Sequence, residues 1–405
     1  MAAMRYRRQT LGYFNEETIM MPDRLFRVPP AIHVGEGAAA RTGEEAKRLG
    51  ARKVLVITDA YLAKSGTIGP VMDSLTAAGL ETAVYDQVNA EPTLAHVTEC
   101  VALCKKSGSE VIIGCGGGSP IDVAKAVSAM AVNGGKIQDY MGIGKLPKPG
   151  LPIIAVPTTA GTGSEATVTT IIADTERDIK MLIISPFLLP AVAVVDPLLT
   201  LGMPKGITAA TGIDAITHAI EAYVSRKNQP MADVFALNAV KLLHENLPVA
   251  WSEPSNVTAR SKTLLGALQA GIAFSNSSVA LVHGMSRPVG ALFHVAHGVS
   301  NAALLGVVMA FSLQGDYARY ADVALAMGVP DKGSREDIAK AGAEKVRELI
   351  QRLEIPSLTQ LGVTREKLAP LADKMADDAI ASGSPGNNPR IATKEEIIGL
   401  YYEAL

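Results

Sequence analysis

The stretch VIIGCGGGSPIDVAKA (111–126) joins an apolar run, three consecutive glycines and a helical segment, and this order decides the fold. The β-branched run before the glycines predicts a buried strand, and the residues after them predict a helix. The same alternation continues on both sides, with further strands expected at 53–59, 81–86, 152–159 and 191–196. Strands that alternate with helices predict βαβ units, and therefore an α/β fold whose parallel sheet is covered on both faces.

The pattern changes after LTLGMPKG (199–206). From there the chain shows segments of helical period, rich in Ala, Leu and Met, with no convincing strand. We therefore expect an α/β domain over 1–203 and an all-helical domain over 204–405. A polar loop at 381–390, ASGSPGNNPR, is expected before a last short helix.

Composition excludes several classes of protein. The chain has 405 residues, 19% of them charged, and a formal net charge of −2, so it lacks the basic excess of a nucleic-acid-binding protein. Its apolar stretches, such as 301–311, are shorter than the ~18 residues that a membrane helix needs. The first residues, MAAMRYRRQTLGYFNEET, have no apolar core of a signal peptide, and the three cysteines are expected as free thiols. We therefore expect a cytoplasmic protein that binds neither membrane nor nucleic acid.

The glycine loop (116–118) is suited to binding an anion. Without side chains, its backbone amides can be approached closely. We expect Ser119 as the N-cap of the following helix, Pro120 at its first position, and Asp122 in its first turn. Free amides and the helix dipole favour a pyrophosphate there, although the sequence is neither GxGxxG nor a Walker motif. The alternative is a tight turn without a ligand.

A second loop, PTTAGTGSEAT (157–167), follows the next expected strand. Ligands of doubly wound sheets lie beyond the carboxyl ends of the strands, where this threonine loop would meet the glycine loop. Its hydroxyls could hold ribose, phosphate or a carboxamide, and they belong to Thr158, Thr159, Thr162 and Ser164. A flexible surface loop is the alternative.

Asp59 ends the first strong strand. An acidic residue at this place commonly accepts hydrogen bonds from an adenosine ribose and repels a 2′-phosphate, which favours NAD over NADP. It can equally be a helix cap.

The second half contains a candidate metal site. In GIDAITHAIEAYVS (212–225), Asp214 and His218 lie four residues apart, so that both face the same side of a helix. A buried Asp–His hydrogen bond is the alternative interpretation. His283 and His297 lie on either side of an expected break at 288–290, and two helical segments could each add one imidazole. One carboxylate and three imidazoles suit Zn²⁺ or Fe²⁺.

Together, GGGSPIDVAKA, PTTAGTGSEAT, GIDAITHAIEAY and HGMSRPVGALFHVAHGVSNA resemble the iron-containing (group III) alcohol dehydrogenase family, over nearly the whole chain. The resemblance implies a dinucleotide-binding α/β domain followed by a helical domain, a homodimer or larger homo-oligomer, and a small alcohol or aldehyde as substrate. It implies NAD(H) and Fe²⁺ as cofactors, with Zn²⁺ possible. The implied metal ligands are Asp214, His218, His283 and His297. The implied NAD site comprises Asp59, Gly117, Gly118, Ser119, Asp122, Thr158, Thr159, Thr162, Thr167 and Lys180.

The chain departs from this family at Arg287. Alcohol-oxidising members usually read HGMxH, and their second histidine is proposed to relay protons, whereas this chain reads HGMSR. Arginine stays protonated and cannot titrate as a relay. Three explanations remain open: His294 takes over the relay, Arg287 binds a carboxylate, sulfonate or phosphonate of the substrate, or Arg287 pairs with a nearby carboxylate as scaffolding.

We expect an NAD-dependent oxidoreductase that interconverts a small alcohol and its aldehyde or ketone by metal-assisted hydride transfer. One rival is a sugar-phosphate cyclase such as dehydroquinate synthase, which would want a basic cluster near the ligands. A second is a maleylacetate reductase, which dispenses with the metal. A third is a binding or structural subunit that has lost catalysis, with Arg287 as the lesion.

Overall fold

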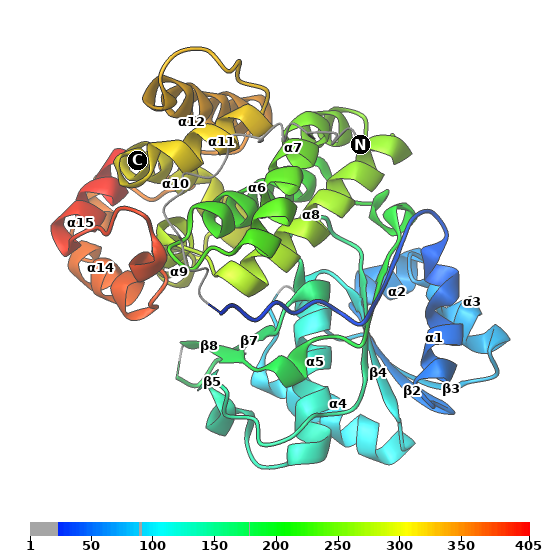
Figure 1. The fold of residues 1–405 in the computed structure, drawn as a ribbon. Coiled ribbons are helices and arrows are strands. Elements are labelled where there is room, and N and C mark those ends of the chain that lie inside the picture. The colour runs from blue at the N-terminus through cyan, green and yellow to red at the C-terminus, as the bar shows by residue number, and fades with distance from the viewer. Residues whose placement is uncertain (1–22, 89–90, 178) are drawn as a thin grey trace, which may run out of the picture.

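The computed structural model describes residues 23–88, 91–177 and 179–405 (Figure 1). The N-terminal stretch in which we expect no signal peptide lies outside these residues. Among the described residues, strands occur only before residue 196 and the later elements are helical, as predicted for an α/β part followed by a helical part.

The α/β part is built on a six-stranded parallel sheet in the order β1-β9-β6-β4-β2-β3. The strands are β1 (Ala31–Val34), β2 (Lys53–Ile57), β3 (Glu81–Tyr85), β4 (Val111–Gly116), β6 (Ile153–Pro157) and β9 (Val192–Val195). The central strands β4 and β6 are buried along their whole length, which agrees with their continuous apolar runs. The five predicted strands are therefore confirmed, and β1 was missed.

Helices cover both faces of this sheet. On one face, residues of α1 and α3 pack against the side chains of Val54, Val56 and Ile113. On the other face, α4 and α5 pack against Leu55, Ile57 and Ile112. The alternation along β2 sends successive side chains to opposite layers, and Figure 1 shows the two helix layers on either side of the strands. The helices of this part are α1 (Thr42–Arg48), α2 (Ala60–Ser65), α3 (Gly69–Ala77), α4 (Leu94–Ser107) and α5 (Gly118–Asn133).

A smaller three-stranded sheet, which the sequence patterns did not reveal, packs beside α5. Its order is β5-β8-β7, and β7 and β8 form an antiparallel hairpin. The strands are β5 (Gly142–Ile143), β7 (Thr169–Asp174) and β8 (Ile179–Ile184). Ile172, Met181 and Ile183 lie in one apolar cluster with Ala126 and Met130 of α5, so this sheet extends the α/β part toward the helical part.

The helical part begins with α6. Its helices are α6 (Lys205–Val224), α7 (Pro230–Ser252), α8 (Val257–Ser277), α9 (Leu281–Phe293), α10 (His297–Ser312), α11 (Tyr317–Ala326), α12 (Arg335–Arg352), α13 (Arg365–Leu368), α14 (Ala372–Ala381) and α15 (Lys394–Glu403). The domain boundary that we predict near residue 203 falls between β9 and α6 and stays a prediction. The buried Arg260 of α8 joins this segment to the helical part, because its guanidinium donates to Met203 O and to Thr208 Oγ1.

One apolar segment is longer than the sequence analysis predicts. Among the described residues, His297–Gly315 is long and apolar enough to span a membrane, with 19 residues and a mean hydropathy of 1.4. The pair α8 and α9 passes the same test only as one span bent by 103°. In His297–Gly315, 56% of the apolar window is buried inside the protein, as in a helix of a protein core. The three cysteines are free and buried, as expected.

The predicted break at 288–290 is wrong. Helix α9 continues through Pro288 and ends at Phe293, and the chain turns at His294, whose φ of 55° and ψ of 28° are left-handed. Proline removes one helical hydrogen bond but does not always end a helix. His283 and His297 still lie on two successive helices, α9 and α10, as predicted.

Candidate functional site

The glycine loop has no room for side chains at two of its positions. A Cβ at Gly116 would lie 2.6 Å from Pro120 Cγ, and one at Gly118 would lie 2.9 Å from Thr162 Cγ2. Helix α5 begins at Gly118 with the extended Gly117 as its N-cap, so the predicted N-cap Ser119 is wrong by two residues. Pro120 is accordingly the third residue of the helix rather than the first, and Asp122 lies beyond the first turn. The first turn of α5 therefore starts without a capping side chain from Gly117, a geometry that suits a phosphate group at the helix N-terminus.

The threonine loop lies directly beside the glycine loop, as predicted. The Thr158 amide donates to Gly116 O at 2.8 Å, and the position of a Gly117 Cβ would be 3.5 Å from the Thr159 side chain. Because β4 and β6 are parallel neighbours, their carboxyl ends bring both loops to one edge. The backbone of the glycine loop and the hydroxyls of the threonine loop thus lie together at one edge of the sheet.

Two of the predicted cofactor residues bond within the protein. The carboxylate of Asp122 accepts from Ser164 Oγ at 2.7 Å and from the Ile171 amide at 3.0 Å. The fully buried Lys125 donates to Thr167 Oγ1 at 2.8 Å and to Thr169 O at 2.8 Å. These bonds fasten α5 and the threonine loop to β7.

Buried charges accompany these bonds. Burial lowers the pKa of Lys125 to about 8, although Asp122 and Glu165 oppose this shift. Burial raises the pKa of Glu165 to about 7, against the influence of Lys125. The threonine loop therefore rests on ionisable groups that titrate near neutral pH.

Asp59 and Lys180 lie at the margins of this surface. Asp59 is the N-cap of α2, and its Oδ1 accepts from the Leu62 amide at 2.8 Å, which agrees with the capping alternative. Lys180 on β8 forms an ion pair with Glu91. Burial lowers the pKa of His297 against the influence of Asp214, and the positive charges of His283, Arg287 and Lys180 lower it further, so Lys180 lies within electrostatic range of His297.

The four predicted metal ligands, here called the ligand set, come together from three helices. Asp214 Oδ1 lies 3.6 Å from His283 Nε2 and 3.7 Å from His297 Nε2. His218 Nδ1 lies 3.9 Å from Asp214 Oδ2, and its ring stacks on that of His283 with centroids 4.4 Å apart. Asp214, His283 and His297 form a group whose ligand atoms all lie within 4.8 Å of one another, and His218 adjoins it.

These separations fit a divalent metal ion. Two atoms bonded at ~2.1 Å to a tetrahedral ion lie roughly 3.4 Å apart, close to the two distances from Asp214. The amide nitrogen of Asn301 on α10 lies 2.6 Å from Asp214 Oδ1, 3.1 Å from His283 Nε2 and 3.3 Å from His297 Nε2, so these atoms face a common position. His218 Nδ1 is buried without a hydrogen-bond partner among the described residues, as expected of a nitrogen that binds a metal ion.

Charge also favours a cation at this position. Asp214 is buried, yet its three histidine neighbours hold its pKa well below the usual range, so the carboxylate stays ionised. Burial lowers the pKa of His218 to about 3, which keeps that imidazole neutral. Burial alone would lower the pKa of His283, but the carboxylates of Glu221 and Asp214 raise it to about 9, and the same field attracts a metal ion. Neutral imidazole and ionised carboxylate are the forms that bind metal, so Asp214 and His218 already have the binding form, whereas His283 gives up a proton when the ion binds.

Access to the ligand set is from the side of His297. Its side chain is 49% exposed, whereas those of Asp214 and His283 are buried. A substrate oxygen can approach along this flank. Arg287 lies nearby, since its charge acts on both His297 and Glu221, and burial lowers its pKa. Among the described residues, no hydrogen bond or ion pair to Arg287 is found.

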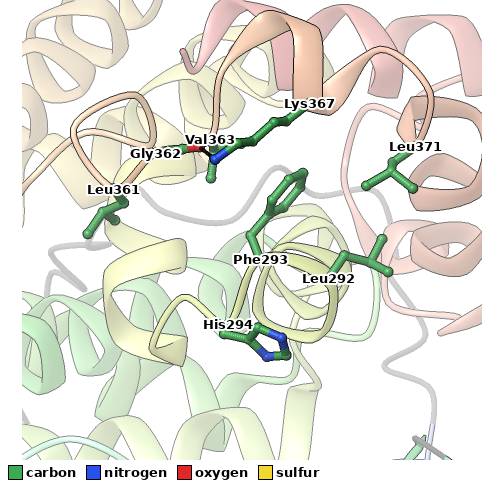
Figure 2. Close-up of a pocket in the computed structure, with 8 residues that line it drawn as sticks. All are labelled: Leu292, Phe293, His294, Leu361, Gly362, Val363, Lys367 and Leu371. Carbon is green, nitrogen blue, oxygen red and sulfur yellow. Dashed lines mark hydrogen bonds between the residues drawn. The ribbon is translucent and has the colours of Figure 1, made fainter.

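His294 lines a different region. Its side chain borders a surface cavity of about 410 Å³ with Leu292, Phe293, Leu361, Gly362, Val363, Lys367 and Leu371 (Figure 2). No member of the ligand set lines this cavity. The structure therefore brings Arg287 within electrostatic range of His297, whereas His294 lines this separate cavity.

Two residues of the site escaped the sequence analysis. Glu221 lies seven residues after Asp214 on α6, and its carboxylate contacts His283 Nδ1 at 2.6 Å. Asn301 lies four residues after His297 on α10. Helical spacing places both on the same faces as the ligands, and this spacing was the available signal.

The chain matches two family models and is similar to known proteins over most of its length. Residues 29–197 match the model "Iron-containing alcohol dehydrogenase", and residues 208–405 match "Fe-containing alcohol dehydrogenase family, C-terminal". The chain is 37% identical to an NAD-dependent methanol dehydrogenase of Bacillus methanolicus, over 94% of this chain and 99% of that protein. A crystal structure of 1,3-propanediol oxidoreductase is 36% identical with a TM-score of 0.92, covering 95% of this chain and 100% of that one. A sulfoacetaldehyde reductase from Bifidobacterium kashiwanohense, solved with NAD⁺, is 30% identical with a TM-score of 0.85, covering 94% and 98%.

Proposed function

Since this chain belongs to the iron-containing alcohol dehydrogenase family, we propose that its substrates are a small acidic alcohol and the matching aldehyde, with Arg287 binding the anionic group. The chain is an NAD-dependent alcohol dehydrogenase, and NAD and iron are the cofactors of its family. The general reaction is therefore the interconversion of an alcohol and an aldehyde with NAD. The acidic substrate and the dependence on a metal are the proposals made here.

The observation that carries the proposal is the state of Arg287. Its side chain is partly buried beside the ligand set, and within 23–88, 91–177 and 179–405 it has no hydrogen bond or ion pair. The carboxylate whose charge acts on it, Glu221, already accepts from the amides of Ala280 and Val282 and contacts His283. A partly buried guanidinium that finds no partner among the described residues is stabilised when an anion joins it. This argues against scaffolding and for a substrate anion.

A relative supports the same chemistry. The sulfoacetaldehyde reductase that is similar to this chain acts, by its name, on an aldehyde that carries a sulfonate. The planar fork of arginine suits carboxylate, sulfonate and phosphonate oxygens equally. We therefore propose the shared class, a short aldehyde with a terminal oxyanion.

The cofactors fit the residues present. The ligand set would hold a divalent metal, and the glycine and threonine loops would hold NAD. When bound, the metal supplies electrostatic stabilisation of negative charge on the substrate oxygen, and NAD supplies the hydride acceptor. Arg287 orients the far end of the substrate, and it keeps its own proton at ordinary pH. The exposed flank of His297 lets water take up the alcohol proton, and His294 stays the alternative carrier.

Oxidation of NADH with matched aldehydes tests the anchor. We would compare sulfoacetaldehyde and succinate semialdehyde with butanal, using wild type, Arg287→Met and Arg287→Lys. The wild type should prefer the acidic aldehydes, and Arg287→Met should reduce kcat/KM for them roughly 100-fold, the loss of a charged hydrogen-bonded pair. Activity with butanal should change little. Arg287→Lys should retain part of the preference.

The matched control is Arg352→Met, which removes one charge from an exposed arginine at the end of α12. A preference for butanal in the wild type, or an unchanged preference in Arg287→Met, contradicts the anchor. Loss of butanal turnover in His294→Ala would then assign the proton relay to His294. We also propose a homodimer or larger homo-oligomer in the cytoplasm, which light scattering and cell fractionation test.

A further inference from the structure

Helix α9, which carries His283, starts from an irregular backbone. Ser278 has a φ of 67° and a ψ of 164°, a region that non-glycine residues rarely occupy. Ala280 follows with a φ of −129° and a ψ of −137°, and α9 is bent by 103° from α8. The first amides of α9 therefore need partners from outside the helix.

Glu221 provides these partners. Its carboxylate is buried with 3% exposure, and it accepts from the Ala280 amide at 2.9 Å and from the Val282 amide at 2.6 Å. The same carboxylate lies 2.6 Å from His283 Nδ1. Since Glu221 lies on α6 with Asp214 and His218, one side chain connects the helix of two ligands to the helix of a third.

The contacts on both sides of the His283 ring determine which of its nitrogens can bind a metal ion. A carboxylate only accepts hydrogen bonds, so the 2.6 Å contact with Glu221 requires a proton on Nδ1. The Asn301 amide nitrogen only donates, and it lies 3.1 Å from Nε2, so Nε2 is the bare nitrogen when the ring is neutral. Nε2 is also the nitrogen that faces Asp214 Oδ1.

We propose that Glu221 is a positioning residue for the metal centre: it docks the start of α9 on α6 and keeps the Nδ1 proton of His283, so that Nε2 faces the metal. This inference rests on the metal site of the proposed function. Carboxylates that orient a metal-bound histidine commonly change metal affinity 10- to 100-fold when they are replaced. Here the same carboxylate also holds the backbone that carries the ligand.

Glu221→Gln separates the two protonation patterns. Whichever carboxylate oxygen becomes the NH₂ group, a donor then faces a donor. If it replaces Oε1, it faces the Val282 amide, and if it replaces Oε2, it faces the Ala280 amide and His283 Nδ1. The helix start opens, or the ring moves its proton to Nε2. Glu221→Asp keeps the charge but withdraws it by one methylene, and it serves where the glutamine variant folds poorly.

The matched control is Tyr401→Phe. The buried Tyr401 hydroxyl donates to Met285 O of the same helix at 2.7 Å, and it touches neither nitrogen of His283. This variant also removes one buried hydrogen bond from α9. It therefore reports the effect of loosening the helix alone.

The measurement is the Zn²⁺ affinity of each full-length protein, in competition with a chromophoric chelator, together with Tm with metal and with excess chelator. We expect Glu221→Gln to bind Zn²⁺ roughly 10- to 100-fold more weakly, with a smaller metal-induced rise in Tm, and Glu221→Asp to lie between it and wild type. Tyr401→Phe should lower Tm by the same amount in both conditions, and its affinity should stay within about threefold of wild type.

Wild-type affinity in Glu221→Gln, or an equal loss in Tyr401→Phe, overturns the positioning role. A wild-type protein that binds no Zn²⁺ overturns the metal centre itself and the inference with it. Failure of the acidic-substrate proposal leaves the metal affinities unaffected, so the outcomes are distinguishable.

Discussion

The cofactor edge of the sheet and the ligand set are built in different ways. The cofactor edge consists of two short loops at the ends of β4 and β6. Its glycines have no side chains, so much of its surface is backbone. The ligand set uses side chains of α6, α9 and α10, separated by up to 83 positions from Asp214 to His297. A backbone surface tolerates exchange of neighbouring side chains, whereas a cluster of side chains depends on the placement of whole helices.

Asp214→Ala should have the largest effect, and it should affect the ligand set alone. It removes the only carboxylate of the ligand set, so we expect kcat/KM to fall by about a thousandfold or more, because stabilisation of charge by a metal is worth several kcal/mol. The affinity for NADH, measured by fluorescence titration, should stay unchanged because the cofactor edge is untouched. Weakened NADH binding would show that the two regions are coupled.

The pH dependence of stability probes the cofactor edge through Glu165. Burial raises its pKa from 4.5 to about 7, so the folded state holds the proton more tightly than the unfolded state. Stability therefore falls as pH rises from about 4.5 to 7 and then levels off. Glu165→Gln removes this loss, and its gain in unfolding free energy over wild type should be about 2 kcal/mol larger at pH 8 than at pH 5.

Urea unfolding at both pH values measures this difference. Glu403→Gln, at an exposed position of α15, is the control and should leave the pH dependence unchanged. A gain for Glu165→Gln that is the same at pH 5 and pH 8 would contradict the raised pKa.

Gly118→Ala is the smallest of these tests. The new Cβ would lie 2.9 Å from Thr162 Cγ2, and overpacking of this kind costs ~1–3 kcal/mol. We expect KM for NADH to rise roughly tenfold while Zn²⁺ affinity stays at the wild-type value. Gly399→Ala on α15, where no atom lies within 4 Å of the added Cβ, is the matched control. A loss of metal in Gly118→Ala would refute the independence of the two regions.

The sequence predicted those parts of the molecule whose signal is local. The strand–glycine–helix unit at 111–126, the neighbouring threonine loop and the α6 pair of Asp214 and His218 all follow from spacing within one or two elements. The hairpin of β7 and β8 was missed because Thr169, Thr170 and Lys180 interrupt its apolar pattern.

Other features depend on tertiary contacts. Pro288 looks like a helix end, but α9 is held at its start by Glu221 and along its length by Tyr401, and it continues through the proline. The role of Glu221 likewise could not be predicted from the sequence. Its partners are distant along the chain, with Ala280 59 positions away and His283 62 positions away. Spacing on α6 identified the helix face, but not what packs against it.

The bond from Tyr401 to Met285 O has a consequence for the order in which the protein is made. Its two ends are 116 positions apart, and Asn387 adds a second late contact when its amide donates to Val279 O at 3.0 Å. A ribosome has synthesised the whole cofactor edge and every metal ligand long before it reaches these residues. The nascent chain can thus form its nucleotide-binding sheet early, while the helix of His283 acquires these supports only after Asn387 and Tyr401 have been synthesised.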